Sequence, residues 1–171
     1  MKKNLLYTEP CCWAVVFVSP ASGGVERNGA IATNAQLVRT ANYCEKNGLI
    51  IENVLLLTDN DRFPAFYKMV EFIRSRDYKI AVVADTADAL FTHDFNKVTM
   101  LDYLYREGKI EIHLVKEKTI LNRPYSREDN QIWANIRKIH AEYHSGLIDM
   151  VKELAQPKQQ KLRSTKGEQH V

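Results

Sequence analysis

Trp13-Ala14-Val15-Val16-Phe17-Val18 is a short, wholly apolar run rich in β-branched and aromatic residues. Runs of this length that are bounded by polar turn residues are typical of strands buried on both faces. Two similar runs follow at 50–57 and 79–84, and segments with helical periodicity separate the three. Because strands that alternate with helices form parallel sheets covered by helices, the sequence predicts an α/β fold.

The spacing of apolar residues predicts helices after these strands, over 32–47, 64–76 and 94–107. In the first helix, Leu37, Ala41 and Cys44 are spaced to form one apolar face. The run 109–115 then alternates polar and apolar residues, which predicts a half-buried edge strand with His113 on its polar face. The expected architecture is a mainly parallel sheet of about four to five strands flanked by helices.

The segment 126–156 carries an apolar residue at every third or fourth position, at Ile132, Ile136, Ile139, Tyr143, Leu147, Val151 and Leu154. A stripe sustained over about six turns predicts one long helix after the α/β domain. Two interpretations stay open. The helix either packs on its own sheet, or leaves the domain and pairs with a partner subunit, and the second is favoured.

The chain thus divides into an N-terminal extension (1–12), an α/β domain (13–125), a long helix (126–156) and a polar tail (157–171) that is expected to be disordered. Residues 155–171 hold four basic residues and one acidic residue, 4 − 1 = +3, which is the net charge of the whole chain. The rest of the chain therefore has no basic excess. The candidate DNA-binding residues are those of the tail, Lys158, Lys161, Arg163 and Lys166.

Several classes of protein are excluded by the sequence. No apolar run approaches the roughly 20 residues of a membrane span, and the first residues are too polar for a signal peptide. Three cysteines, two of them adjacent, do not suggest a disulfide framework, so a cytoplasmic protein is expected. His140 and His144 have metal-ligand spacing but no evident third ligand, so neither a metal nor a cofactor is expected.

Five segments, in order, resemble one family. They are the Ser-containing loop after 14–18, Pro64 to Met69, Asp88-Ala89-Leu90, the run 108–117, and the segment 136–145. Their order and spacing are similar to the N-terminal catalytic domain of serine site-specific recombinases, the resolvase/invertase family. The resemblance covers about residues 13–154 and is nearest to the large, transposon-type branch.

This resemblance implies that a serine attacks a DNA phosphodiester while arginines neutralise the phosphate, and that the long helix forms a dimer interface. The motifs are degenerate, however. The family's Tyr-x-Arg-x-Ser falls on 17–21, which places Ser19 at the arginine position and Ala21 at the nucleophile position. Its Asp-Arg-Leu-x-Arg falls on 88–92, which places Ala89 and Thr92 at both arginine positions.

The sequence therefore predicts an inactive recombinase homologue that dimerises through 126–154, with itself or with an active relative. Two alternatives stay open. One is an active strand-exchange enzyme that uses Ser22, one residue after the family position, with Arg62 and Asp88. The other is a DNA-binding accessory protein that uses the basic tail.

Overall fold

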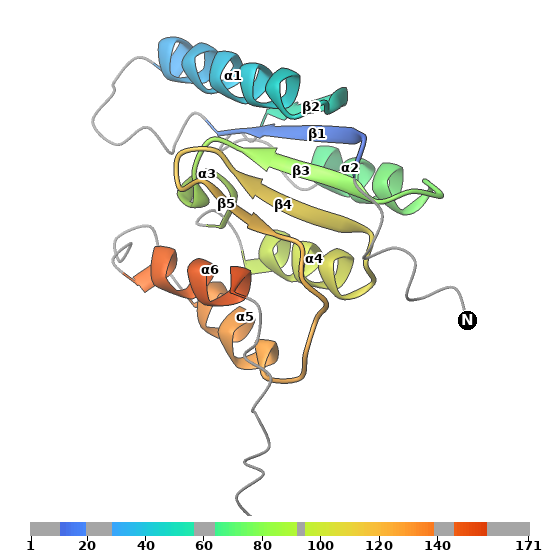
Figure 1. Ribbon diagram of the computed structural model, residues 1–171, viewed down its shortest axis with the longest axis vertical. Coiled ribbons are helices and arrows are strands. Elements are labelled where there is room, and N and C mark those ends of the chain that lie inside the picture. Colours follow the sequence, from blue (N-terminus) through green and yellow to red (C-terminus); the bar gives the residue numbers. More distant parts are fainter. Residues whose placement is uncertain (1–10, 20–28, 57–63, 92–94, 139–145, 157–171) are drawn as a thin grey trace, which may run out of the picture.

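A computed structural model of the chain describes residues 11–19, 29–56, 64–91, 95–138 and 146–156. Its centre is one sheet with the strand order β2-β1-β3-β4-β5 (Figure 1). The strands are β1 (Trp13–Val18), β2 (Ile50–Leu56), β3 (Ile80–Ala84), β4 (Ile110–Leu114) and β5 (Thr119–Leu121). The first four are parallel and β5 is antiparallel to β4, which confirms the predicted mainly parallel α/β fold.

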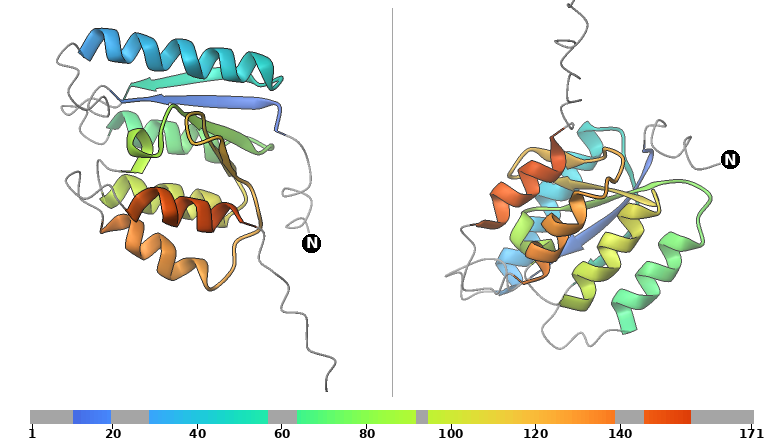
Figure 2. Two further views of the ribbon diagram at one scale, coloured as in Figure 1. Left: turned by 60° about the vertical axis from the view of Figure 1, so that its left-hand side comes forward. Right: turned by 90° about the horizontal axis from the view of Figure 1, so that it is seen from below.

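Helices cover the two faces of this sheet unequally (Figure 2). The helices are α1 (Gly29–Lys46), α2 (Pro64–Arg74), α3 (Ala87–Phe91), α4 (Phe95–Arg106), α5 (Asp129–Arg137) and α6 (Leu147–Ala155). Helix α1 lies alone on one face, and the others lie on the opposite face. No helix among the described residues is long and apolar enough to cross a membrane.

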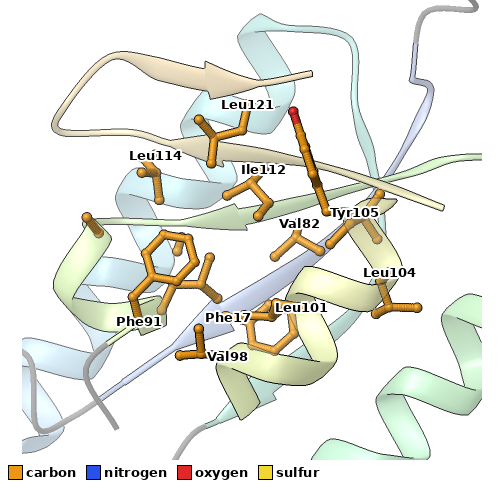
Figure 3. Close-up of a cluster of buried hydrophobic side chains, with 14 of the residues drawn as sticks. Phe17, Val82, Phe91, Val98, Leu101, Leu104, Tyr105, Ile112, Leu114 and Leu121 are labelled. Carbon is orange, nitrogen blue, oxygen red and sulfur yellow. The ribbon is translucent and has the colours of Figure 1, made fainter. Parts of the chain in front are cut away.

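The larger hydrophobic core fills the space between the sheet and α2 to α6 (Figure 3). Phe17, Val82 and Ile112 reach into it from successive strands, and Leu101 and Leu104 reach into it from α4. Each of these side chains is at most 1% exposed. Such close packing gives the parallel strands a rigid base, which fixes the carboxyl ends of the strands.

The prediction that 109–115 forms an edge strand is wrong. Strand β4 pairs with β3 on one side and with β5 on the other, so His113 is only 5% exposed. The alternation of polar and apolar residues reflects instead a buried polar cluster on the α1 face. The edges of the sheet are β5 and β2.

The structure also differs from the prediction of one long helix over 126–154. Helices α5 and α6 are separate, with caps at Lys138 and Gly146, and they pack against each other. Helix α6 also packs on β5 and α3. Of the described residues of the apolar stripe, Ile136, Leu147, Val151 and Leu154 are buried within the larger core, each at most 1% exposed. In the structure these residues therefore pack on their own domain, which is the first of the two interpretations left open by the sequence.

Candidate functional site

The carboxyl ends of β1, β3 and β4 meet at one edge of the sheet, where parallel α/β folds place their active sites. Ser19 follows β1, Asp85 follows β3, and Lys116 lies just beyond β4. Helix α1 crosses the same edge and contributes Gln36 and Arg39.

The peptide group of Ser19 is clamped by Gln36 of α1. The Gln36 amide nitrogen donates to the Ser19 carbonyl at 2.7 Å, and its amide oxygen accepts from the Ser19 N–H at 3.1 Å. Ser19 is 0% exposed and Gln36 is 3% exposed. Gln36 thereby replaces the backbone pairing that β1 loses where the strand ends, and it fixes the start of the following loop.

Asp85 is buried at the end of β3 and is paired with a cation on each side. Arg39 donates from Nε and Nη2 to the two carboxylate oxygens, both at 2.8 Å. Lys116 Nζ lies 3.6 Å from Oδ2. Because a planar guanidinium matches a carboxylate at two points, Arg39 is committed to Asp85 in this arrangement.

The segment with Asp88 forms the short helix α3. Its amino end is held by two side-chain acceptors, since Thr86 Oγ1 accepts from the Ala89 N–H at 3.1 Å and Glu117 Oε1 accepts from the Ala87 N–H at 3.0 Å. Asp88 lies half-buried in the first turn. Ala89 is 0% exposed and belongs to the larger core.

A second polar cluster lies on the α1 face of the sheet, away from this edge. His113 Nε2 is 2.6 Å from Glu111 Oε1, and His113 Nδ1 is 2.7 Å from the Tyr43 hydroxyl. Lys79 Nζ lies 3.2 Å from the other Glu111 oxygen. An ionised carboxylate only accepts, so the His113 proton belongs on Nε2 and Tyr43 donates to Nδ1.

Burial and charge act in opposite directions on this cluster. Burial, the largest single effect, raises the pKa of Glu111, but the hydrogen bond from His113 and the ammonium of Lys79 outweigh it and hold the pKa below the ordinary value of 4.5. Burial raises the pKa of the Tyr43 hydroxyl. It also raises the pKa of the neighbouring Cys11 thiol, which disfavours the thiolate near neutral pH.

Most of the predicted site residues lie outside the described residues. These are Ser22, Arg62, Ala21 and Thr92, together with the tail residues Lys158, Lys161, Arg163 and Lys166 and the histidines His140 and His144. Among the described residues, the structure brings Ser19 and Asp88 to the same edge of the sheet. Within the part of the chain that the structure describes, no group of three or more His, Cys, Asp or Glu side chains could hold a metal ion.

Sequence reasoning missed Arg39, one of the two cations that the structure places beside Asp85 at this edge. Arg39 lies three residues after Gln36 and four residues before Tyr43, so all three side chains project from α1 toward the sheet. This spacing could have identified a polar face of the helix. The sequence led us to expect an apolar face instead, whereas among the side chains of 33–46 those that α1 buries are Gln36, Thr40 and Cys44.

The fold and this edge together define an α/β domain with a candidate site at the carboxyl ends of its strands.

No protein-family model matches the chain, and no curated protein matches it significantly. Several solved structures are similar, and two of them are serine recombinase or integrase catalytic domains. The N-terminal catalytic domain of TP901-1 integrase has a TM-score of 0.50 at 12% identity, over 72% of this chain and 90% of that chain. The C-terminal catalytic domain of ISC1926 TnpA, an IS607-like serine recombinase, has a TM-score of 0.46 at 17% identity, over 83% and 97%.

The chain therefore has the fold of a serine recombinase catalytic domain, as its sequence resemblance implied. At 12% identity the likeness to TP901-1 integrase extends to the fold alone.

Proposed function

We propose that this chain is a serine-recombinase-like domain that takes part in DNA recombination without cutting DNA, as an assembly or regulatory partner. One observation carries the proposal. Ala89, which falls where the family's motif has its first arginine, is 0% exposed and packed in the hydrophobic core. A guanidinium at this position would need space and solvation that the core does not offer.

The charges at the carboxyl edge support the same conclusion. Phosphoryl transfer needs cations that are preorganised around the phosphate oxygens. The carboxylates of Asp85, Asp88 and Glu117 lie at this edge, and Arg39 already binds Asp85 at two points. A DNA phosphate would have to compete with a buried carboxylate for the guanidinium, which disfavours both binding and catalysis.

Dimerisation through 126–154 stays a prediction. Four of the apolar residues that were expected to meet a partner, Ile136, Leu147, Val151 and Leu154, are buried in the domain itself. Pairing through them requires α5 and α6 to leave the sheet, whereas pairing through their outer faces does not.

The test is a search for a covalent protein–DNA adduct. The protein is incubated with supercoiled plasmid and with phosphorothiolate-nicked duplex, in parallel with an active serine recombinase as the positive control. We expect an adduct with the control and none with this chain. An adduct that disappears in Ser22→Ala would overturn the proposal and identify Ser22 as the nucleophile.

The basic tail gives a second candidate function, non-specific DNA binding. Its four cations and one carboxylate, Glu168, together give the net charge of +3. Binding to a duplex of random sequence should weaken steeply between about 50 and 200 mM salt, and it should disappear when 157–171 are removed. Binding that survives removal of the tail would assign DNA contact to another surface.

A further inference from the structure

Helix α1 lies alone on its face of the sheet, yet it buries few apolar side chains (Figure 1). It is the longest of the described helices, with 18 residues. Among the side chains of 33–46, those that it buries are Gln36, Thr40 and Cys44. Two of these three are polar, whereas the apolar side chains of Leu37 and Val38 are 37% and 58% exposed. The docking of α1 therefore draws little on the hydrophobic effect.

The helices on the opposite face dock in a different way. Helix α4 has 12 residues and α2 has 11. Each buries four large apolar side chains that are at most 4% exposed, which are Val98, Leu101, Leu104 and Tyr105 in α4 and Phe66, Met69, Val70 and Ile73 in α2. Since the stability of a helix in a protein comes mainly from the packing of its apolar face, α1 is held more weakly than α2 or α4.

The part of the sheet that α1 covers is made of small side chains. The smaller core cluster consists mostly of alanine and valine, with Ala14, Val16, Val18, Ala81 and Val83 from the strands. The larger cluster, on the opposite face, is rich in leucine, isoleucine and aromatic rings. Separation of α1 from the sheet therefore exposes less apolar surface than separation of the helices on the other face.

Three polar contacts along α1 join it to the sheet. The pairs are Gln36 with Ser19, Arg39 with Asp85, and Tyr43 with His113. When such a contact opens, water replaces each partner, so the net contribution of the contact to the closed state is small. The Asp85 carboxylate, which is 3% exposed, regains its hydration when the helix moves away, and this offsets much of the lost ion pair.

A detached α1 would not keep its helical hydrogen bonds. Asparagine and threonine are weak helix formers, and the segment 33–42 contains two of each, Thr33, Asn34, Thr40 and Asn42. Even alanine-rich helices are marginal in water below about 12–15 residues, and α1 is only slightly longer. Opening therefore gives solvent access to the backbone amides of α1.

We propose that α1 opens from the sheet and closes again while the strands and α2 to α6 stay folded, and that its position sets the state of the carboxyl edge. In the closed position Gln36 holds Ser19, and Arg39 is bound to Asp85. In the open position the Arg39 guanidinium is released, and Asp85 faces water with Lys116 as its cation. A ligand or partner that binds one position more tightly thereby controls which charges the edge presents.

Hydrogen exchange of the full chain at pH 7 tests the proposal by comparing the backbone amides of 38–42 in α1 with those of 100–103 in α4. Both sets lie away from the helix ends, so fraying does not explain a difference between them. The protection factors of the α1 amides should be lower by at least about 10²-fold, because these amides exchange through a local opening. Equal protection factors in the two helices would overturn the proposal.

The variant Ile136→Val distinguishes a local opening from global unfolding. Ile136 is 0% exposed in the larger core, on the face of the sheet opposite to α1. Loss of one buried carbon should raise the equilibrium constant of global unfolding about two- to tenfold. The protection of the α4 amides should fall by that factor and the protection of the α1 amides should not change, because the opening of α1 leaves α5 packed. An equal fall in both helices would mean that α1 opens only with the whole domain.

The variant Tyr43→Phe tests the polar contacts. It keeps the ring and removes the hydroxyl that bonds to His113 Nδ1 at 2.7 Å, so the protection of the α1 amides should fall about two- to tenfold. Val38→Ala is the matched control, because Val38 is 58% exposed on the outer face of the same helix. This control should not lower the protection of α1. Equal protection in Tyr43→Phe and Val38→Ala would show that the contact with His113 does not hold α1 closed.

The Cys44 thiol provides a second measurement that does not use backbone amides. Cys44 is 1% exposed under α1, so a thiol reagent reaches it when the helix opens. In a Cys12→Ser background, the rate of its modification, followed by mass spectrometry, should rise with Tyr43→Phe and stay unchanged with Ile136→Val. A rate that rises with Ile136→Val as α4 exchange does contradicts a local opening. None of these measurements involves DNA, so this proposal and the proposed function fail separately.

Discussion

Arg39 of α1 and Asp85 at the end of β3 are joined by two parallel hydrogen bonds, Nε to Oδ1 and Nη2 to Oδ2, each 2.8 Å long. The two partners are not equally exposed, since the side chain of Asp85 is 3% exposed and that of Arg39 is 42% exposed. A buried carboxylate cannot regain its hydration when its partner is removed. Loss of the Arg39 side chain should therefore destabilise the fold more than the exposure of Arg39 alone would suggest, because it leaves the Asp85 carboxylate buried.

We expect Arg39→Ala to lower the free energy of unfolding by about 1–3 kcal/mol, because Lys116 compensates only part of the lost charge. The control is Arg74→Ala. Arg74 and Glu107 form an exposed pair at 3.5 Å, and its loss should cost no more than about 0.5 kcal/mol. Urea unfolding at pH 7 measures both. An equal loss in the free energy of unfolding for the two variants would show that burial of Asp85 does not strengthen its ion pair with Arg39.

Trp133 provides a second prediction. It is 0% exposed in α5 and packs against Phe91 of α3 and Tyr105 of α4, with ring centroids 5.9 Å away in each case. Trp133→Ala should cost about 3–5 kcal/mol through the cavity that it leaves. The indole N–H has no hydrogen-bond partner among the described residues, so Trp133→Phe should cost clearly less. Similar costs in urea unfolding would indicate a hydrogen bond to the indole.

The order of strands and helices along the chain was predictable because each apolar run is long enough to show its own period. The runs around Val15 and Val82 are buried on both faces, and such runs leave little choice of structure. Helix α4 was equally clear, with Val98, Leu101 and Tyr105 all buried as the spacing predicted.

Features that depend on contacts between distant segments were not predictable. Whether β2 or β4 forms an edge depends on the strand order, which the run 50–57 does not encode. The apolar stripe of 126–154 is compatible with packing on its own domain or on a partner, and only the contacts of Ile136 and Leu147 with the core show that these residues pack on their own domain. Arg39 becomes part of the site only because α1 crosses the end of β3, where Asp85 lies.

The three cysteines should differ in reactivity, which gives a third prediction. None forms a disulfide, and Cys12 is exposed while Cys44 is buried. Burial raises the pKa of Cys44 to about 11 and also raises that of Cys11. At pH 8 a thiol reagent such as DTNB should therefore modify Cys12 quickly and the other two slowly. Cys12→Ser should remove the fast phase, and unfolding in urea should make all remaining thiols fast. A fast phase that persists in Cys12→Ser would contradict the burial of the other two.

Glu111 should make the stability of the protein sensitive to acid. It is buried between His113 and Lys79, and its pKa in the folded state lies below the ordinary value of 4.5. A carboxyl group with a lowered pKa contributes stability that is fully present above its unfolded pKa and is lost as pH falls through the folded pKa. The contribution of Glu111 is therefore complete at pH 7 and declines below pH 4.5.

Glu111→Gln isolates this contribution. At pH 7 the variant should be less stable than the wild type by about 2–3 kcal/mol, because the Lys79 ammonium, in a residue 8% exposed, loses its counter-charge. As pH falls below 4.5, the wild type begins to lose this advantage, whereas the variant has no carboxyl group there to titrate. The difference in urea midpoint between the two should shrink over that range. A difference that stays constant down to pH 3 would mean that the pKa of Glu111 is the same in the folded and unfolded states, and that the cluster of Tyr43, His113 and Lys79 does not stabilise its charge.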